Sequence, residues 1–123
     1  MAMYKTTKAD FSEFKAECDR WISHFGLLDW EVCYTHDGDS DDTRATCYPD
    51  YEARIVILTL GTEWTMKPEK HEVKMIAFHE VCELLLSPLS LAADNRYTTK
   101  GTIIAAIHSI IRRLENTVFK DGE

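Results

Sequence analysis

The segment that most constrains the fold is residues 73–86, which is apolar on almost every side when placed on a helix at about 100° per residue. Its apolar residues include Val73, Met75, Ala77, Phe78, Val81, Cys82, Leu84, Leu85 and Leu86. A helix with so little polar surface is typical of a protein interior. We therefore expect a buried helix over residues 68–87, with Pro68 in its first turn and Pro88 as its stop.

Three polar side chains interrupt the second half of this apolar helix: His79, Glu80 and Glu83. His79 and Glu83 are one turn apart and share a face with Glu72, and Glu80 lies at the border of that face. Burying carboxylates without a partner is costly, so the sequence predicts a cation or hydrogen-bond donors opposite them. A metal ion and arginine side chains are the two kinds of cation to consider.

The order His79-Glu80-Val81-Cys82-Glu83 is an H-E-x-x-E version of the H-E-x-x-H zinc motif. Ligands at positions i and i+4 of a helix project side by side, and a carboxylate oxygen binds zinc as an imidazole nitrogen does. We therefore predict His79 and Glu83 as ligands of Zn²⁺ or another divalent transition metal, and Glu80 as the catalytic general base. Because glutamates at this spacing are common on helices, a solvated or salt-bridged acidic face is the alternative.

A third metal ligand has to come from elsewhere in the chain. His108 lies at the edge of the apolar stripe of the last predicted helix and is our candidate. Glu115, seven residues later, is then expected to accept a hydrogen bond from the other ring nitrogen of this histidine. Glu115 or Glu72 would be the ligand if His108 is not. Arg112 and Arg113 give the rival explanation, in which arginines neutralise the buried glutamates.

The rest of the chain predicts an α+β domain that begins with a helix over residues 10–25. Asp10 and Glu13 resemble a capping box at its start, and Gly26 is a suitable stop in the left-handed conformation. Residues 30–35, 44–48 and 53–60 have the composition of strands, with a charged loop over 37–42 and a turn at Pro49 and Asp50. Short connections favour a three-stranded antiparallel meander.

The last predicted element is a C-terminal helix over residues 99–119, capped by Thr98 or Thr99. One apolar stripe runs along it and is expected to face the core; its members are Ile103, Ile107, Ile110, Leu114 and Val118, with Ile104 and Ile111 beside it. The order of elements is then one helix, three strands, the helix with His79, and this C-terminal helix.

Composition limits the class of protein. With 123 residues, 45% of them apolar, the chain fits a single domain, residues 1–123. A net charge of -7 argues against non-specific binding to nucleic acid but is compatible with a basic partner. The sequence has no apolar run of bilayer length and no secretory signal, which favours the cytoplasm. The four cysteines are accordingly expected to be reduced thiols.

Two segments carry a resemblance to known proteins. KMIAFHEVCELLL, after a strand reading ARIVILTL, resembles the small zincin metallopeptidases of the SprT-like and minigluzincin type. FHEVCELLL followed by IHSIIRRLEN resembles phage-encoded metallopeptidase-like proteins of about this length, and the resemblance covers residues 30–119. It implies His79 and Glu83 as ligands, Glu80 as general base, and residues 53–60 as the edge strand of the active site. The sequence departs from the family at Glu83, where those peptidases usually carry histidine.

Two functions are compatible with these features. The first is a zinc-dependent peptidase that hydrolyses a peptide or protein substrate lying along strand 53–60, with Glu80 transferring a proton to the leaving amine. In a phage-encoded protein it would act in the host cytoplasm. The second is a non-catalytic protein, either metal-stabilised or acidic, that occupies a basic host partner.

Overall fold

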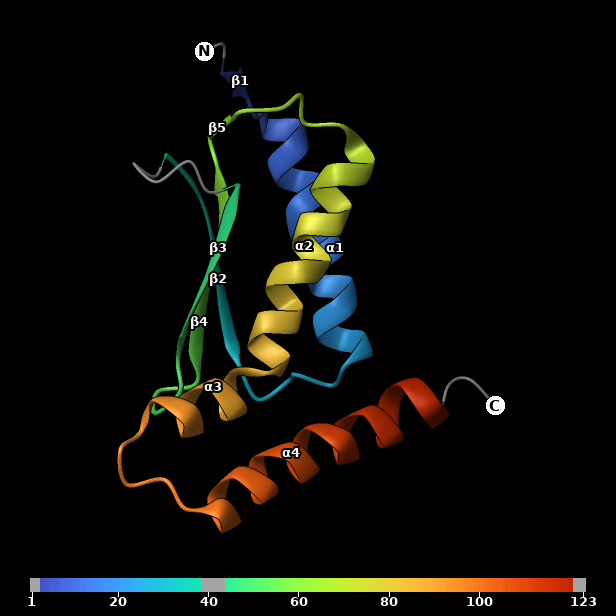
Figure 1. Cartoon of the computed structure of the whole chain (residues 1–123). Coiled ribbons are helices and arrows are strands. Elements are labelled where there is room, and N and C mark those ends of the chain that lie inside the picture. Colours follow the sequence, from blue (N-terminus) through green and yellow to red (C-terminus); the bar gives the residue numbers. More distant parts are fainter. Residues whose placement is uncertain (1–2, 39–43, 121–123) are drawn as a thin grey trace.

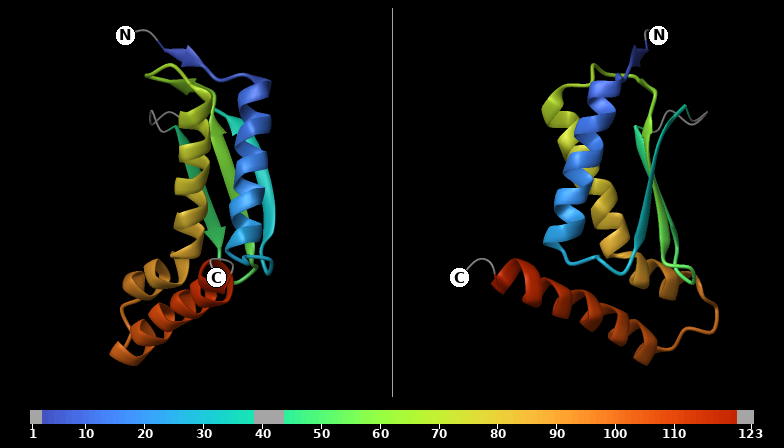
Figure 2. Two further views of the ribbon diagram at one scale, coloured as in Figure 1. Left: turned by 90° about the vertical axis from the view of Figure 1, so that its right-hand side faces the viewer. Right: turned by 180° about the vertical axis from the view of Figure 1, so that it is seen from behind.

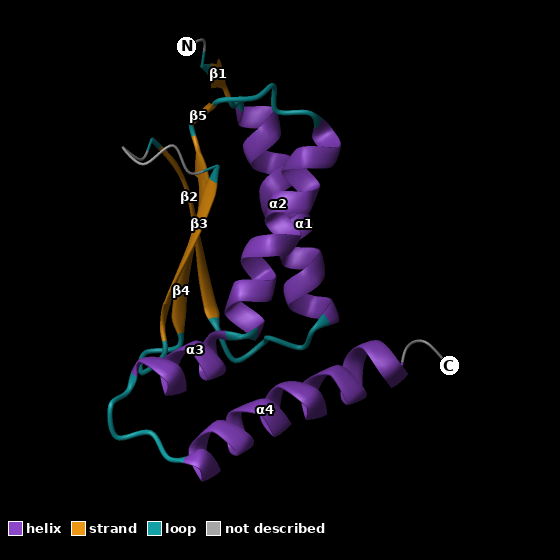
Figure 3. Cartoon of the chain, viewed as in Figure 1, coloured by secondary structure: helices purple, strands orange, loops and turns teal. Residues whose placement is uncertain are grey.

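The computed structural model describes residues 3–38 and 44–120, so most of the charged segment 37–42 lies outside the described residues. In chain order the elements are β1 (Tyr4–Lys5), α1 (Lys8–His24), β2 (Glu31–Asp37), β3 (Ala45–Asp50), β4 (Ile55–Gly61), β5 (Glu63–Trp64), α2 (Lys70–Leu85), α3 (Ser87–Asp94), α4 (Lys100–Leu114) and the π-helical turn η1 (Glu115–Phe119). The α1 and α2 helices cover one face of the main sheet, and α3 and α4 lie across its end (Figures 1 and 3). The predicted α+β class is confirmed.

The main sheet is mixed, so the predicted antiparallel meander is wrong. Its strand order is β2-β4-β3, with β2 parallel and β3 antiparallel to the central β4. Two sequence features explain this order. The most apolar strand, β4, gains most from having neighbours on both sides, and Val56, Leu58 and Leu60 are fully buried. Pro49 has no N–H to donate and is therefore suited to an edge strand, and it lies within β3.

This order corrects two further expectations. Residues 53–60 do not form an edge strand, because β4 pairs on both sides; β2 and β3 are the edges. Pro49 and Asp50 do not form the turn, because both belong to β3 and pair with β4. The turn follows them at residues 51–54, where Arg54 has a φ of 58°.

The first helix begins and ends through local interactions. Its N-cap is Thr7, whose side chain accepts a hydrogen bond from the Asp10 N–H, while the Asp10 carboxylate accepts one from the Thr7 N–H. This capping box replaces the one predicted for Asp10 and Glu13, and α1 starts earlier as a result. Gly26 has a φ of 67°, which confirms its predicted left-handed conformation after the helix end.

The core lies between α1, α2 and the sheet. Phe14, Cys18 and Ile22 of α1 are buried against this core, as are Val73, Ala77, Val81 and Leu84 of α2. The predicted burial of α2 is confirmed for the sides that face α1 and the sheet. Its remaining side is more open, since Met75 and Phe78 are partly exposed. Figure 2 shows how α1 and α2 lie side by side on the same face of the sheet.

Pro88 starts a helix as well as ending one. The α2 helix stops at Leu85, and α3 follows with Pro88 in its first turn, where proline's missing N–H is no disadvantage. Within the described residues, no single helix is long and apolar enough to cross a membrane. Only when α2 and α3 are taken together do they reach the length and apolar composition of a membrane-spanning helix, and the two are bent by 53° at their junction.

The C-terminal helix differs from its predicted packing. Thr99 caps α4 as expected, but only Ile110 of its apolar stripe is buried. Leu114 is partly buried against the core, whereas Ile103, Ile107 and Val118 are exposed. The expected core stripe is therefore wrong over most of its length, because α4 crosses the end of the domain instead of packing along the sheet (Figure 2).

We predict that Gly26→Ala lowers the free energy of unfolding by about 1–2 kcal/mol, because a left-handed conformation is strained for any residue with a Cβ. The added Cβ would also lie 3.2 Å from the Thr117 Cγ2 atom. Urea denaturation measures the change. Gly101→Ala is the matched control: it adds a methyl group within α4 at ordinary contact distance, and should raise stability by about 0.5–1 kcal/mol. Equal effects at both positions would contradict the explanation.

Candidate functional site

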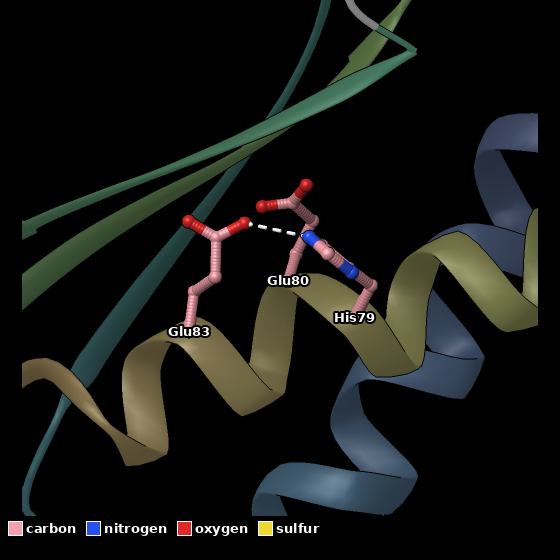
Figure 4. Close-up of side chains that lie close together, drawn as sticks. All are labelled: His79, Glu80 and Glu83. Atoms are coloured by element: carbon pink, nitrogen blue, oxygen red, sulfur yellow. Dashed lines mark ion pairs between the residues drawn. The ribbon is translucent and has the colours of Figure 1, made fainter.

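The three polar residues of α2 come together at one place on the helix. The His79 Nε2 atom lies 3.0 Å from Glu83 Oε2, and one potential ligand atom from each of His79, Glu80 and Glu83 lies within 4.8 Å of the others. Figure 4 shows His79 and Glu83 facing each other across one helical turn, while Glu80 points toward the strands. The i and i+4 geometry that the sequence predicts is therefore present.

Burial differs sharply within this cluster. Glu80 is only 3% exposed, whereas the side chains of His79 and Glu83 are 63% and 52% exposed. The expectation that all three lie on a buried face is correct for Glu80 alone. The cluster thus has a buried carboxylate at its base and two solvent-facing groups above it.

The position of Glu80 on the helix explains its burial. It follows the buried Val73 by seven residues and the buried Ala77 by three, and it precedes the buried Leu84 by four. These spacings place Glu80 in the same apolar row that packs against the core. Packing of its neighbours therefore holds a carboxylate where a leucine or valine would normally lie.

The surroundings of Glu80 favour its protonated form. Its Oε2 atom is buried and has no hydrogen-bond partner among the described residues. Burial raises the pKa of Glu80 from an ordinary value of 4.5 to about 8, and the nearby Glu83 carboxylate adds to this shift. A carboxyl group whose pKa lies near neutrality, beside a histidine and a second carboxylate, is typical of functional sites.

The arginines proposed as partners of the buried glutamates are engaged elsewhere. Arg112 Nε lies 4.0 Å from Glu115 Oε1, and Arg113 pairs with Asp29 at 3.7 Å and donates to the Gly26 carbonyl. Within the described part of the chain, no lysine or arginine forms an ion pair with Glu80. In this structure, Arg112 and Arg113 therefore do not neutralise the glutamates of the α2 cluster.

The structure does not bring the expected third ligand to the cluster. His108 lies on exposed α4, where its Nδ1 atom is 3.0 Å from the Ile104 carbonyl oxygen one turn earlier. Glu115 is on the same helix and pairs with Arg112 rather than with His108. Glu72 is on α2 but pairs with Arg44 at 3.6 Å. In this arrangement all three stand apart from His79, Glu80 and Glu83.

Cys47 is a residue near the site that the sequence does not single out. It lies on β3 and lines, together with Glu83, a pocket of about 360 Å³ between the sheet and α3. Burial raises the pKa of its thiol to about 12, and the charges of Glu80 and Glu83 contribute. Once β3 is known to be a strand, the alternation of its side chains would place Cys47 with the inward-facing set. What the sequence lacked was the sheet order, which puts β3 beside α2.

Comparison with protein-family models, with curated proteins and with solved structures finds no match for this chain. The chemistry of the site is therefore the basis on which a function has to be argued. Its elements are a buried carboxyl group with one oxygen atom that has no partner among the described residues, two exposed groups able to bind a cation, and a neighbouring pocket.

We predict that stability falls as pH rises through the titration range of Glu80. Because the pKa of this group is higher in the folded state, the folded protein binds the proton more tightly than the unfolded chain. The stabilisation is complete below about pH 4.5 and is lost as pH approaches about 8. Urea denaturation of metal-free protein across this range measures the effect.

The variant Glu80→Gln should lose this component of the pH dependence, so that its stability relative to the native protein increases with pH. Glu52→Gln, at an exposed turn position, is the matched control and should keep the native profile. Parallel profiles for native protein and Glu80→Gln would show that Glu80 is not the titrating group.

Proposed function

We propose that the protein is a metal-dependent peptidase whose centre is built on α2. The observation that carries the proposal is the Glu80 carboxyl group, which is buried, has an Oε2 atom without a hydrogen-bond partner among the described residues, and lies beside His79 and Glu83. Leaving such a group without a partner is destabilising, so its presence requires a compensating role. The resemblance of this segment to zincin peptidases supports the same role for the three residues.

The side chains present suit a zinc ion or a similar divalent cation. His79 and Glu83 would hold it, since imidazole nitrogen and carboxylate oxygen both bind zinc and side chains four residues apart on a helix project side by side. Cys47 on β3 is the nearby thiol that could add a donor from a second element. A bound cation of this kind supplies Lewis acidity, which polarises a carbonyl group and lowers the pKa of water.

Glu80 has the properties of a proton-transfer residue. A cation close to its carboxyl group would lower the pKa again from about 8, so that the group is ionised at neutral pH. As a carboxylate it accepts a proton from the attacking water, and it then donates that proton to the leaving amine. Its rigid position between Ala77 and Leu84 keeps the carboxyl group in place for both transfers.

An extended substrate that reaches the α2 cluster would use β3, because β4 is not available and β3 is the edge strand that packs against α2. The expected site for an added strand was residues 53–60, but β4 is paired on both sides. The β3 strand has a free edge in the described structure and lies beside α2, and its Cys47 lines the pocket next to Glu83. A peptide bound there as an extra strand would place its side chains toward that pocket.

The acidic, non-catalytic binding protein stays the second candidate. The exposure of His79 and Glu83 favours it, because an open cluster on one helix is also what a solvated acidic face looks like. A net charge of -7 would attract a basic partner to such a face. The two functions differ in whether a metal binds and in what Glu80 does.

We predict that the protein binds about one equivalent of Zn²⁺, and that the double variant His79→Ala/Glu83→Ala loses it. Added zinc at a hundredfold excess over the dissociation constant should stabilise the native protein by about 2.7 kcal/mol. Elemental analysis after purification without chelator, together with thermal denaturation, makes the measurement. A native protein without metal, and without stabilisation by zinc, would refute the metal centre.

The variant His108→Ala tests whether the C-terminal helix takes part in zinc binding. At least a tenfold loss of zinc affinity would include His108 among the ligands, as the sequence suggests. An unchanged affinity would leave it outside the centre, in the exposed position where the structure places it. Cys47→Ser, measured in the same way, tests the donor from β3.

We predict that Glu80→Gln keeps the metal and lowers peptidase activity by roughly 10²- to 10⁴-fold, because the amide cannot accept the proton. Cleavage of a broad fluorogenic peptide library measures the activity, and elemental analysis confirms the metal. Glu52→Gln should retain native activity. If the native protein cleaves no peptide and Glu80→Gln is indistinguishable from it, the acidic binding protein replaces the peptidase.

A further inference from the structure

The C-terminal helix α4 has one side that contacts the domain and an exposed apolar side next to it. The side toward the domain carries Ala106 and Ser109, which line a gap beside α3, together with the buried Ile110 and the partly buried Leu114. Arg113 extends from the same side to Gly26 and Asp29. These contacts fix how α4 is oriented and leave the adjacent side of the helix as an outward face.

That outward face is a continuous apolar stripe. Its members are Ile103 (37% exposed), Ile104 (42%), Ile107 (40%), Ile111 (45%) and Val118 (42%). Their spacing of three, four and seven residues keeps them on one side of the helix through its whole length and into η1. β-branched side chains at such positions are typical of helix–helix interfaces rather than of solvated surfaces.

We propose that this stripe, Ile103–Ile104–Ile107–Ile111–Val118, is an interface between two copies of the chain, in which the two α4 helices pack antiparallel across a two-fold axis near Ile107. The partner is a second copy because the stripe is complementary to itself. In an antiparallel pair, the isoleucines of the N-terminal half meet those of the C-terminal half, and Ile107 lies near the axis. Such a self-matching surface is what a two-fold interface requires.

The charges at the two ends of the stripe select the antiparallel orientation. Lys100 stands at its N-terminal end and has no ion pair among the described residues. Glu115 stands near its C-terminal end, 57% exposed, with only a 4.0 Å contact to Arg112. An antiparallel pair brings Lys100 of each copy close to Glu115 of the other. A parallel pair would instead place like charges together, which is unfavourable.

Sedimentation equilibrium of the full-length protein, metal-free and at several concentrations, tests the interface. We expect a monomer–dimer equilibrium, and Ile107→Asp should raise the dimer dissociation constant by roughly a hundredfold, because it places a charge in the apolar centre. Ala105→Asp is the matched control: it adds the same charge on α4 outside the stripe, at an exposed position that lines the open gap beside α3, and should leave association nearly unchanged. Circular dichroism confirms that both variants are folded.

A charge exchange tests the orientation. Lys100→Glu and Glu115→Lys should each weaken association by about two- to tenfold, and the double variant should restore it. A native protein that stays monomeric at the highest concentrations reached, or a dimer insensitive to Ile107→Asp, would refute the interface. A dimer weakened by Ile107→Asp but not restored in the double charge variant would refute the antiparallel pairing.

Discussion

The packing of α2 against both α1 and the sheet (Figure 2) is the interaction on which the rest of the structure depends. Val73, Ala77, Val81 and Leu84 form its buried row, and burial of each larger apolar side chain contributes about 1.5–3 kcal/mol. Glu80 belongs to this same row. A rotation of the helix that brought Glu80 to solvent would also expose its apolar neighbours. Exposing them would cost more free energy than burying the Glu80 carboxyl group does. The core therefore holds the carboxyl group in an unfavourable environment.

This coupling explains why the cluster is asymmetric. His79 and Glu83 lie beside the buried row, where the helix surface meets solvent, and they can exchange partners at little cost. Glu80 can change its protonation state but not its place. For the proposed chemistry, this arrangement would supply a fixed proton-transfer group and two adaptable ligands.

The sequence predicted those parts of the molecule that local periodicity decides. The α2 helix, the proximity of His79 and Glu83, and the glycine stop at Gly26 all follow from spacing along a few turns. The strand order did not follow, because pairing between distant strands is a non-local choice; Pro49 was the one residue that argued for an edge position. The place of His108 did not follow either, for the same reason, since the packing of α4 decides where His108 lies.

The C-terminal helix shows why an apolar stripe alone does not identify a core. Periodicity reveals that one side of α4 is apolar, but the surface that covers this side can belong to the same chain or to another chain. Here Ile110 and Leu114, with the small residues Ala106 and Ser109, make the intramolecular contact and leave the other isoleucines of α4 exposed. Because α4 lies across the end of the sheet (Figure 1), a second copy on its outer face would leave the exposed side of His79 and Glu83 open. Association through α4 and access to the α2 cluster are thus compatible, and each can be tested without disturbing the other.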